Sequence, residues 1–412
     1  MITFEERRLR TLADQGRWPE LLGLYRRTRA EVAARCGEAG AAVEAAPLGH
    51  LVAYGAPPEL AARLFDQDGG PGTAAGTGDH DAGPLWEVLA TRHSWRRLAP
   101  LLGPPAVRRL VAHTRVLLGE DLSHGAEPDP DGVPLMLESW EVPGWDERCR
   151  VREYLPTGGA RRALVALPAT CEGLGPVALP SPGRQAVGLA ATRLLGGLAS
   201  WLDVACVRGS AVDAAAQLAP GGRPPGRAVD LPGWERLGPG LWDTGRRVSG
   251  RLAPDRAALD RVARDQVALD RAARDRTAMD RVAAGRSARE GAADRPGADG
   301  GRGPRRAVTG GHIPFVVAYP ALVQAASGGP ALGAADGRLA LWRVLAAMTG
   351  ESRLSVPEVN GLIARLRCFT WCEPTDEVWY VHLAVEDPAT GLAWAVSGAE
   401  LDLPAPELPS QG

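Results

Sequence analysis

Apolar residues recur with a helical period through the first 121 residues. Between 17 and 36 the large apolar side chains fall about every 3.6 residues, which predicts an amphipathic helix. These side chains are Trp18, Leu21, Leu22, Tyr25 and Val32. Further helices are expected at 57–65, 84–95 and 104–120. A Gly-rich stretch at 69–83 predicts a flexible surface loop. The pattern therefore indicates an N-terminal helical region at 1–121.

The pattern changes beyond residue 121, where turn-rich segments separate short apolar ones. Segments 149–155 and 161–168 flank a Pro-Thr-Gly-Gly-Ala turn, and together they predict a pair of strands. We therefore expect a mixed α/β region over 122–250, which continues the main domain.

Three serines mark expected helix starts. Ser181 precedes a proline and predicts the N-cap of a helix over 181–202. Ser210 and Ser355 are each followed three residues later by an acidic side chain, Asp213 and Glu358, which is the spacing of a capping box. Short helices are therefore predicted to start at both positions.

The segment 312–403 predicts helices followed by strands. An apolar run at 313–326 indicates a buried helix, because Pro320 interrupts it and it is too short to span a bilayer. A helix over 336–349 should end at Gly350 as its C-cap. The buried face of this helix is expected to include Leu341, Val344, Leu345 and Met348. That of the helix after Ser355 is expected to include Val359, Leu362, Ile363 and Leu366.

The best-defined local pattern lies at 378–400. Trp379, Val381, Leu383 and Val385 alternate with polar or small residues, and Leu392, Trp394 and Val396 repeat that alternation after an Asp-Pro-Ala-Thr-Gly turn. A period of two with such a turn predicts an antiparallel hairpin. We expect its Trp379 and Trp394 face to pack on the helices around Leu345 and Leu362. His382 lies on the other face, where it is expected to be exposed, so that its removal costs little.

These segments together predict an α+β fold that is predominantly helical, with a small C-terminal antiparallel sheet. Trp-x-x-Leu occurs at Trp18, Trp95, Trp234 and Trp342, which is compatible with a helical repeat-like bundle, although buried tryptophans on amphipathic helices explain these copies better. The intervals between these copies are irregular, so a solenoid with a fixed period is not shown. The final residues, 404–412, are expected to form a tail.

The segment 255–290 repeats a five-residue unit in which Ala and Asp recur. Five residues turn a helix by about 500°, so the leucines point in different directions and no coiled-coil seam forms. Nine Arg against seven acidic residues give a net charge of +2, too small for a nucleic-acid-binding helix. We predict a single charged helix, with 251–311 as an insertion and disordered linker whose deletion from 255 to 311 leaves the fold intact.

Composition and charge exclude several classes of protein. Hydrophobic residues make up 45% of the chain and the net charge is -2, which favours a packed core and argues against nucleic-acid or membrane partners. All 47 basic residues are Arg. A phosphate loop, the protein-kinase β3 strand and a pyridoxal Schiff base each need a lysine, so these sites are excluded in their usual forms. No export signal is visible, and the six cysteines are expected to be free thiols in the cytoplasm.

Candidate chemistry is sparse, and no cofactor or metal motif is present. Cys368 and Cys372 come closest to a metal-ligand pair, but without a nearby histidine they are interpreted as structural thiols. His113 and the pair Glu120–Asp121 could serve as general acid and base, although a histidine on a helix face is more often structural. A Ser–His–Asp triad assembled in space stays open.

The region from Gly-Arg-Leu-Ala-Leu-Trp (337–342) to Ser-Gly-Ala-Glu-Leu-Asp (397–402) resembles an uncharacterised actinobacterial family of unknown function. In that family a Gly-Arg-Leu-Ala-x-Trp helix precedes a Thr-Trp segment and a closing hairpin. The family usually closes on a run of Asp and Thr, whereas this chain does not. The resemblance covers about a quarter of the chain and implies no functional residues.

The sequence favours binding over catalysis. The leading hypothesis is a cytoplasmic helical interaction or scaffold protein whose partner is another protein. The alternative is a small-molecule hydrolase or transferase that uses His and carboxylates without Lys or metal. A deep pocket that gathers His113 with carboxylates favours the enzyme, whereas an extended concave apolar surface favours the binding protein.

Overall fold

The computed structural model describes residues 4–66, 84–142, 153–154, 160–161, 165–168, 174–186, 191, 195, 202–219, 306–327, 333–351, 353–372 and 379–400. The chain divides into two units, one comprising Met1–Gly250 with Arg305–Gly412 and the other Arg251–Pro304. All described residues belong to the first unit. The expected repeat helix, the 69–83 loop and the 404–412 tail lie outside the described residues, and the statements about them stay predictions.

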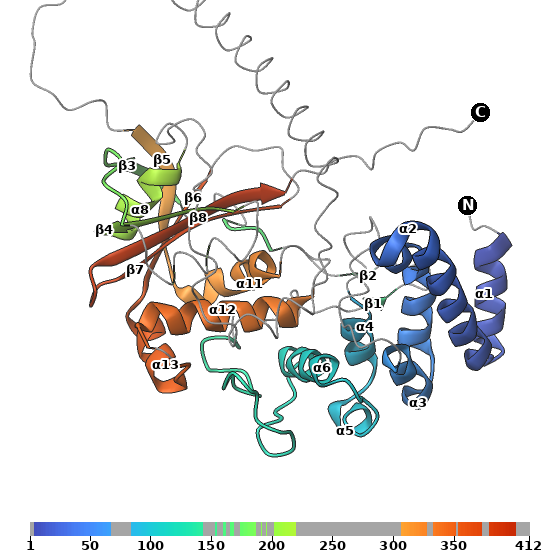
Figure 1. Cartoon of the computed structure of the whole chain (residues 1–412). Helices are drawn as coiled ribbons and strands as arrows, with labels where there is room; N and C mark the ends of the chain where they lie inside the picture. The colour runs from blue at the N-terminus through green and yellow to red at the C-terminus, as the bar shows by residue number, and fades with distance from the viewer. Residues whose placement is uncertain are drawn as a thin grey trace, which may run out of the picture. The chain divides into compact units, whose positions relative to one another are not determined.

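The N-terminal region is helical, as predicted (Figure 1). Its long helices follow the expected amphipathic segments, and short turns complete them. The elements are α1 (Phe4–Asp14), α2 (Trp18–Gly55), α3 (Pro58–Ala61), η1 (Ala62–Phe65), α4 (Leu85–Arg92), α5 (Trp95–Leu98) and α6 (Pro105–Leu117). α2 consists of two helices joined at a kink, where Gly37 adopts a φ of 77°. That left-handed conformation favours glycine, and it ends the first helix one residue beyond the predicted segment.

Most of the long helices pack on the next long helix in the chain. α1 packs on α2, α2 on α4, and α4 on α6. α6 then contacts α12 (Ala334–Thr349), which packs against α11 (Phe315–Ala326). The buried apolar residues of these helices form one continuous core. Among the described residues, no helix is long and apolar enough to cross a membrane.

The strands form one antiparallel sheet and a separate two-stranded ribbon. The sheet has six strands in the order β3-β5-β6-β7-β8-β4. Its strands are β3 (Gly175–Leu179), β4 (Asp203–Arg208), β5 (Arg306–Ile313), β6 (Arg367–Cys372), β7 (Trp379–Asp387) and β8 (Leu392–Glu400). The ribbon pairs β1 (Glu153–Tyr154) with β2 (Ala160–Arg161). An antiparallel pair is therefore present near the predicted turn, but β2 starts within that turn, and residues 165–168 of the second predicted strand do not belong to the pair. The α+β class is therefore shown, and the sheet also receives β3 and β4 from the region 122–250.

The predicted hairpin is present as β7 and β8, which pair from Asp387 and Leu392 outward. Gly391 closes the turn with a φ of 65°. Trp394 is 2% exposed and lies in the same apolar core as Leu345 and Leu362. The expected packing of the Trp394 face on these helices is confirmed.

Helices cover both faces of the sheet (Figure 1). α11, α12 and α13 (Val356–Arg365) belong to the core on the Trp394 face. On the other face, α8 (Ala211–Leu218) packs its alanines against the small residues of the central strands. The capping box at Ser210 and Asp213 starts α8 as predicted. Because helices cover both faces, a polar side chain on either face of the sheet can be buried.

Two boundary predictions are wrong, and a third helix starts where predicted but without its expected capping bond. Residues 306–311, expected in the linker, belong to β5 and pair with both β3 and β6, so a deletion from 255 to 311 removes part of the sheet. Ser181 does not start a helix, because 181–186 runs alongside the edge strand β4, where the Ala186 N–H donates to Cys206. Ser355 precedes α13 but makes no capping bond with its side chain.

Gly337 sets the distance between α11 and α12. A Cβ atom there would lie 2.0 Å from the carbonyl oxygen of Val323, which is backbone and cannot rotate away. We expect Gly337→Ala to destabilise the protein by about 1–3 kcal/mol or more, because the helices must separate. Gly361→Ala is the matched control, since its Cβ would meet only the end of the Arg365 side chain at 3.9 Å. That change should be neutral or stabilising by up to about 1 kcal/mol. Chemical denaturation of both variants tests the difference, and equal losses would contradict the close-approach argument.

Candidate functional site

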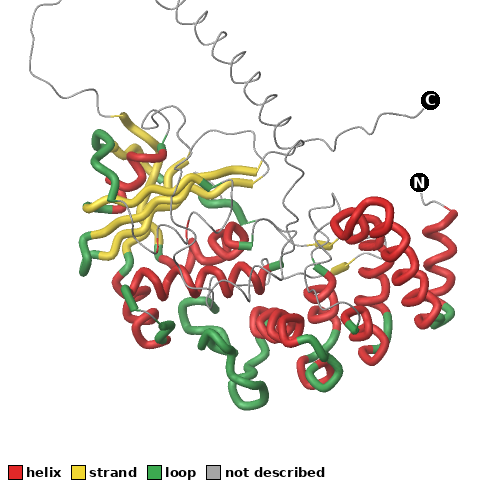
Figure 2. The backbone as a smooth tube through the Cα atoms, viewed as in Figure 1, coloured by secondary structure: helices red, strands yellow, loops and turns green. Residues whose placement is uncertain are grey.

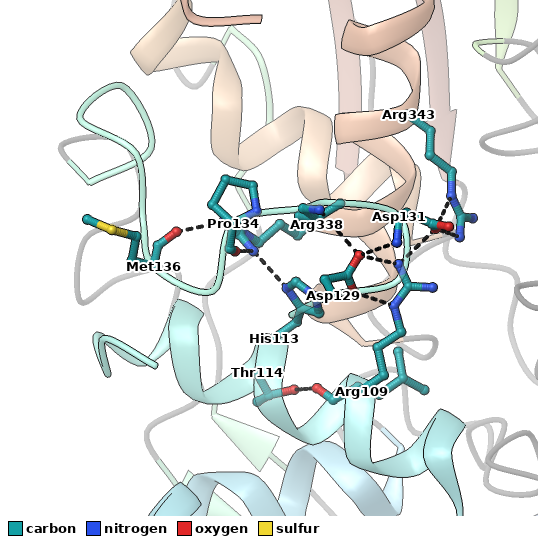
Figure 3. Close-up of polar contacts among 11 residues, drawn as sticks. Arg109, His113, Thr114, Asp129, Asp131, Pro134, Met136, Arg338 and Arg343 are labelled. Atoms are coloured by element: carbon teal, nitrogen blue, oxygen red, sulfur yellow. Dashed lines mark hydrogen bonds and ion pairs between the residues drawn. The ribbon is translucent and has the colours of Figure 1, made fainter. Parts of the chain in front are cut away.

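The centre of the first unit is a fully buried arginine, Arg338, on the second turn of α12. Each of its five N–H groups has an acceptor, and Figure 3 shows those at His113, Pro134 and Met136. Nε and one Nη2 hydrogen donate to the two carboxylate oxygens of Glu141, both at 2.9 Å. The remaining three donate to the carbonyl oxygens of Pro134 and Met136 and to Nδ1 of His113. The guanidinium is therefore saturated and has no hydrogen left for a ligand.

Glu141 is equally enclosed, with 0% exposure. Besides Arg338, its oxygens accept hydrogen bonds from Tyr319 Oη at 2.6 Å and Trp342 Nε1 at 3.1 Å. Burial raises the pKa of this carboxyl, but the charge and hydrogen bonds of Arg338 outweigh it and lower the pKa below its ordinary value. Glu141 is therefore a buried carboxylate held ionised by its partners.

His113 on α6 lies between Arg338 and Asp129. Arg338 can only donate, so Nδ1 of His113 must accept that 2.7 Å bond. Nε2 then carries the proton and donates to Asp129 at 3.0 Å. Burial, helped by the positive charge of Arg338, lowers the pKa of His113 to about 4. The ring is thus neutral, fixed in one tautomer and without a free nitrogen.

The network ends at two further arginines nearer the surface. Arg109 binds both oxygens of Asp129, at 2.6 and 3.0 Å, and also donates to Asp131. Arg343 donates to Asp131 at 2.7 Å. Three arginines therefore face three carboxylates, with the neutral His113 between them. A balanced and saturated cluster of this kind meets the requirement for burying charge.

Local structure explains why these side chains meet. Arg109 and His113 are four residues apart on α6, and Arg338 and Trp342 are four apart on α12, so each pair shares one helix face. The carboxylates come from the segment 118–142, which contains seven acidic residues and no basic one. An acidic loop beside arginine-bearing helices is a signal that the sequence contained and that motif searching missed.

The network fixes the segment 118–142, which has no helix or strand (Figure 2). Arg338 holds its backbone at Pro134 and Met136. Trp140 anchors its far end, because its Nε1 donates to Asn360 at 2.7 Å and its ring packs edge-on against Phe315. We call this segment the pinned loop. Loops longer than about 12–15 residues are uncommon in compact domains and often functional.

The acid–base grouping of His113 with Glu120 and Asp121, the less favoured of the two interpretations, is not formed. Glu120 binds Arg115 at 2.7 Å and accepts the backbone N–H of Trp95, so it caps α5. Asp121 binds the neighbouring Ser123 at the surface. Both carboxylates lie beyond the end of α6, and the chain must turn back before Asp129 reaches His113. The structural interpretation of His113 is therefore the better supported one.

The protonation of His113 can be tested directly by NMR. Because the unfolded state binds the proton near pH 6.5 and the folded state near pH 4, the stability contributed by neutral His113 is lost as pH falls through this window. We expect its ring resonances to show the Nε2–H tautomer and no titration between pH 8 and about 5.5. A His113 that titrates near the ordinary pKa would contradict the arrangement in Figure 3.

The cysteine predictions are partly wrong. Cys368 on β6 is buried and free, and burial raises the pKa of its thiol to about 12, so it is an unreactive structural thiol. Cys372 is disulfide-bonded, which contradicts the expectation that the cysteines are free. A Cys368–Cys372 metal pair is therefore not formed. The cytoplasmic location loses this support and stays a prediction.

His382 differs most from its prediction, because it is 3% exposed. It does lie on the face opposite Trp394, but its ring packs between Trp371 and Tyr380 there. Burial lowers its pKa to about 4. Its Nδ1 hydrogen-bonds to Ser397 Oγ at 3.0 Å. Sequence alternation gave the correct face but not the burial of both faces, so His382→Ala is now expected to leave a cavity.

Within the described residues, no group of three His, Cys, Asp or Glu side chains is arranged to hold a metal ion. No protein family, curated protein or solved structure matches the chain, so the polar clusters around Arg338 and at His382 are interpreted from their own geometry.

Proposed function

We propose that this chain is a helical interaction protein that binds another protein through the pinned loop. The single observation that supports the proposal most is the combination of a fixed backbone with exposed apolar side chains. Met136 is 42% exposed and Val142 52% exposed, although the carbonyl of Met136 is held by the buried Arg338. Figure 3 shows the Met136 side chain pointing away from the network.

Pre-ordering of the loop favours binding for an energetic reason. Association orders side chains and loops, and a segment that is already ordered avoids much of that cost. Methionine adapts its shape to apolar partners and is common at binding surfaces. A partner with a small apolar patch, which Met136 and Val142 could cover, therefore fits this surface.

The packing of the helices supports the helical repeat-like part of the proposal. α1 packs on α2, α2 on α4 and α4 on α6, and α12 packs on α11. This nearest-neighbour arrangement is typical of repeat proteins, which present extended surfaces to partners. In this proposal the helical stack is the scaffold and the pinned loop is the recognition element.

The hydrolase or transferase built on His113 receives no support. Both ring nitrogens of His113 are bound, to Arg338 and Asp129, and the side chain is 0% exposed. A general base needs a free nitrogen within reach of its substrate. The His113 ring is therefore closed to any substrate, and the pocket that would have favoured the enzyme is not formed around it.

Affinity capture with quantitative mass spectrometry, from cells that make the protein, tests the binding proposal. The captured partner is then purified and titrated against the wild type and the variants Met136→Glu and Val142→Glu. We expect each variant to weaken binding at least about tenfold, since a carboxylate replaces an apolar contact. Thermal unfolding confirms that each variant is folded.

Val317→Glu is the matched control. Val317 is 49% exposed, so the same substitution is made at an equally exposed apolar position. It lies on α11 two residues from Phe315, and a helix turns about 200° over two residues, so it points away from the side that meets Trp140. If all three variants weaken binding of the partner equally, the pinned loop is not the binding surface. If none of them weakens binding, the same conclusion follows.

A further inference from the structure

Ser397 and His382 form a close cross-strand pair in the hairpin. Their Cα atoms are partners in the register of β7 and β8. The backbone of His382 points away from β8, because its N–H donates to Leu167 and its carbonyl accepts from Thr370 Oγ1. The pair is therefore of the non-hydrogen-bonded type, in which facing side chains approach most closely. This explains the 3.0 Å between His382 Nδ1 and Ser397 Oγ.

The other nitrogen of His382 is buried without a partner. Nε2 has no hydrogen bond, although the residue is 3% exposed. Leaving a buried polar atom unpaired is destabilising, so the histidine is not there for stability alone. The ring is also held in place, with Tyr380 stacked at 5.6 Å and Trp371 at 5.6 Å on centroid distances.

We propose that Ser397 is a nucleophile activated by His382 and that this pair reacts with activated carboxylic esters. Ser397 is partly exposed, so its oxygen can meet a small electrophile while His382 stays enclosed. Asp203 is the register partner of Ser397 on β4, which puts His382, Ser397 and Asp203 in one row. In a triad the histidine stands in the middle, whereas here the serine does. The proposal therefore uses the His–Ser pair and gives Asp203 no role.

The reaction is an acyl transfer in two steps. Ser397 Oγ attacks the ester carbonyl carbon, and its proton moves to His382 Nδ1. The bond between that carbon and the alcohol oxygen then breaks, and the alcohol leaves with the proton from Nδ1. An acyl-serine ester remains. Water then attacks the acyl carbon while Nδ1 takes its proton, and return of that proton to Ser397 Oγ releases the acid. No oxidant or metal is needed.

The ionisation state of His382 suits a base of this kind. Burial lowers its pKa to about 4, so the ring is neutral and able to accept a proton at pH 7. The titratable side chain stacked on its ring is Tyr380, on the same strand. This chemistry uses a different site from the pinned loop, and it does not depend on the proposed binding function.

The test is acetylation of the full chain by p-nitrophenyl acetate, followed by release of p-nitrophenolate and peptide mass spectrometry. The chain has no lysine, so the main competing amine is the N-terminus. We expect the acetyl group on Ser397 in the folded protein and not after unfolding in urea. Ser397→Ala should abolish that label, and His382→Gln should slow it by about a hundredfold or more.

Ser123 and His124 provide the matched controls, because they are an adjacent serine and histidine on the exposed surface. Ser123→Ala and His124→Gln should leave the labelling of Ser397 unchanged. If His382→Gln does not fold, the wild-type pH profile still decides. A neutral histidine base gives a rate that is flat from pH 5.5 to 8, whereas an unassisted hydroxyl gives a rise of about tenfold per pH unit. Labelling of Ser397 no faster than that of Ser123, or a rising profile, overturns the proposal.

Discussion

Replacing Arg338 with methionine is expected to destabilise the protein by about 3–5 kcal/mol, the largest effect we anticipate from a single charged residue. The substitution leaves Glu141 as a buried carboxylate without its counter-ion, and it removes the donors to the carbonyls of Pro134 and Met136. Breaking a buried ion pair by removing one partner carries a penalty of this order, because the remaining charge is uncompensated. Urea denaturation followed by tryptophan fluorescence measures the loss.

Two further variants separate this explanation from general sensitivity of the core. Arg343→Met removes an arginine whose side chain is 25% exposed, and Asp131 keeps Arg109 as a partner, so the cost should be about 1 kcal/mol or less. Arg338→Met combined with Glu141→Leu removes both charges and should be less damaging than Arg338→Met alone. Equal losses in the two arginine variants would show that the network is not anchored at Arg338.

Trp394→Ala is expected to cost about 3–5 kcal/mol, the usual range for truncating a large buried aromatic side chain. Trp394 is 2% exposed, and it stands between Cys206 on β4 and Val385 on β7 in the register of the sheet. Its removal leaves a cavity between the sheet and the helices around Leu345 and Leu362. β4 and β7 flank Trp394 within the sheet, and the helices cover it, so the surrounding residues have little freedom to fill the cavity.

Leu392→Ala serves as the control for this prediction. Leu392 lies on the same strand and the same face as Trp394 but is partly exposed at the turn end. Its truncation should therefore cost clearly less than that of Trp394. A Trp394→Ala protein with wild-type stability in urea would mean that this face of the hairpin does not pack against the apolar core.

Features that depend on neighbouring residues were predictable from the sequence. The hairpin at β7 and β8, the capping box at Ser210 and the C-cap at Gly350 each arise from a few consecutive residues. Their causes are the alternation of apolar and polar residues, side-chain hydrogen bonding and a left-handed glycine. Each depends only on residues close together in the sequence. These predictions are confirmed for that reason.

Features that depend on distant pairing were not predictable. β5 was taken for linker because its sequence is rich in glycine and its partners, β3 and β6, lie far away in the chain. The burial of Arg338 could not be predicted from its helix, since nothing in the neighbouring sequence shows that the loop 118–142 covers it. The burial of His382 depends on the elements that cover its face of the sheet. The alternation of residues along a strand shows which face a side chain occupies, but not whether another element covers that face.

The contact between His113 and Arg338 joins positions 225 residues apart. On a ribosome the chain emerges from its N-terminus, so α6 and the acidic loop exist long before α12 supplies its arginines. During that interval Glu141 and its neighbours must stay hydrated, and the loop cannot adopt its final path. Contacts of such long sequence separation form late and slowly. The helices before α6 can fold early, but the loop becomes ordered only once the C-terminal part has been made, so truncated chains should lack an ordered loop.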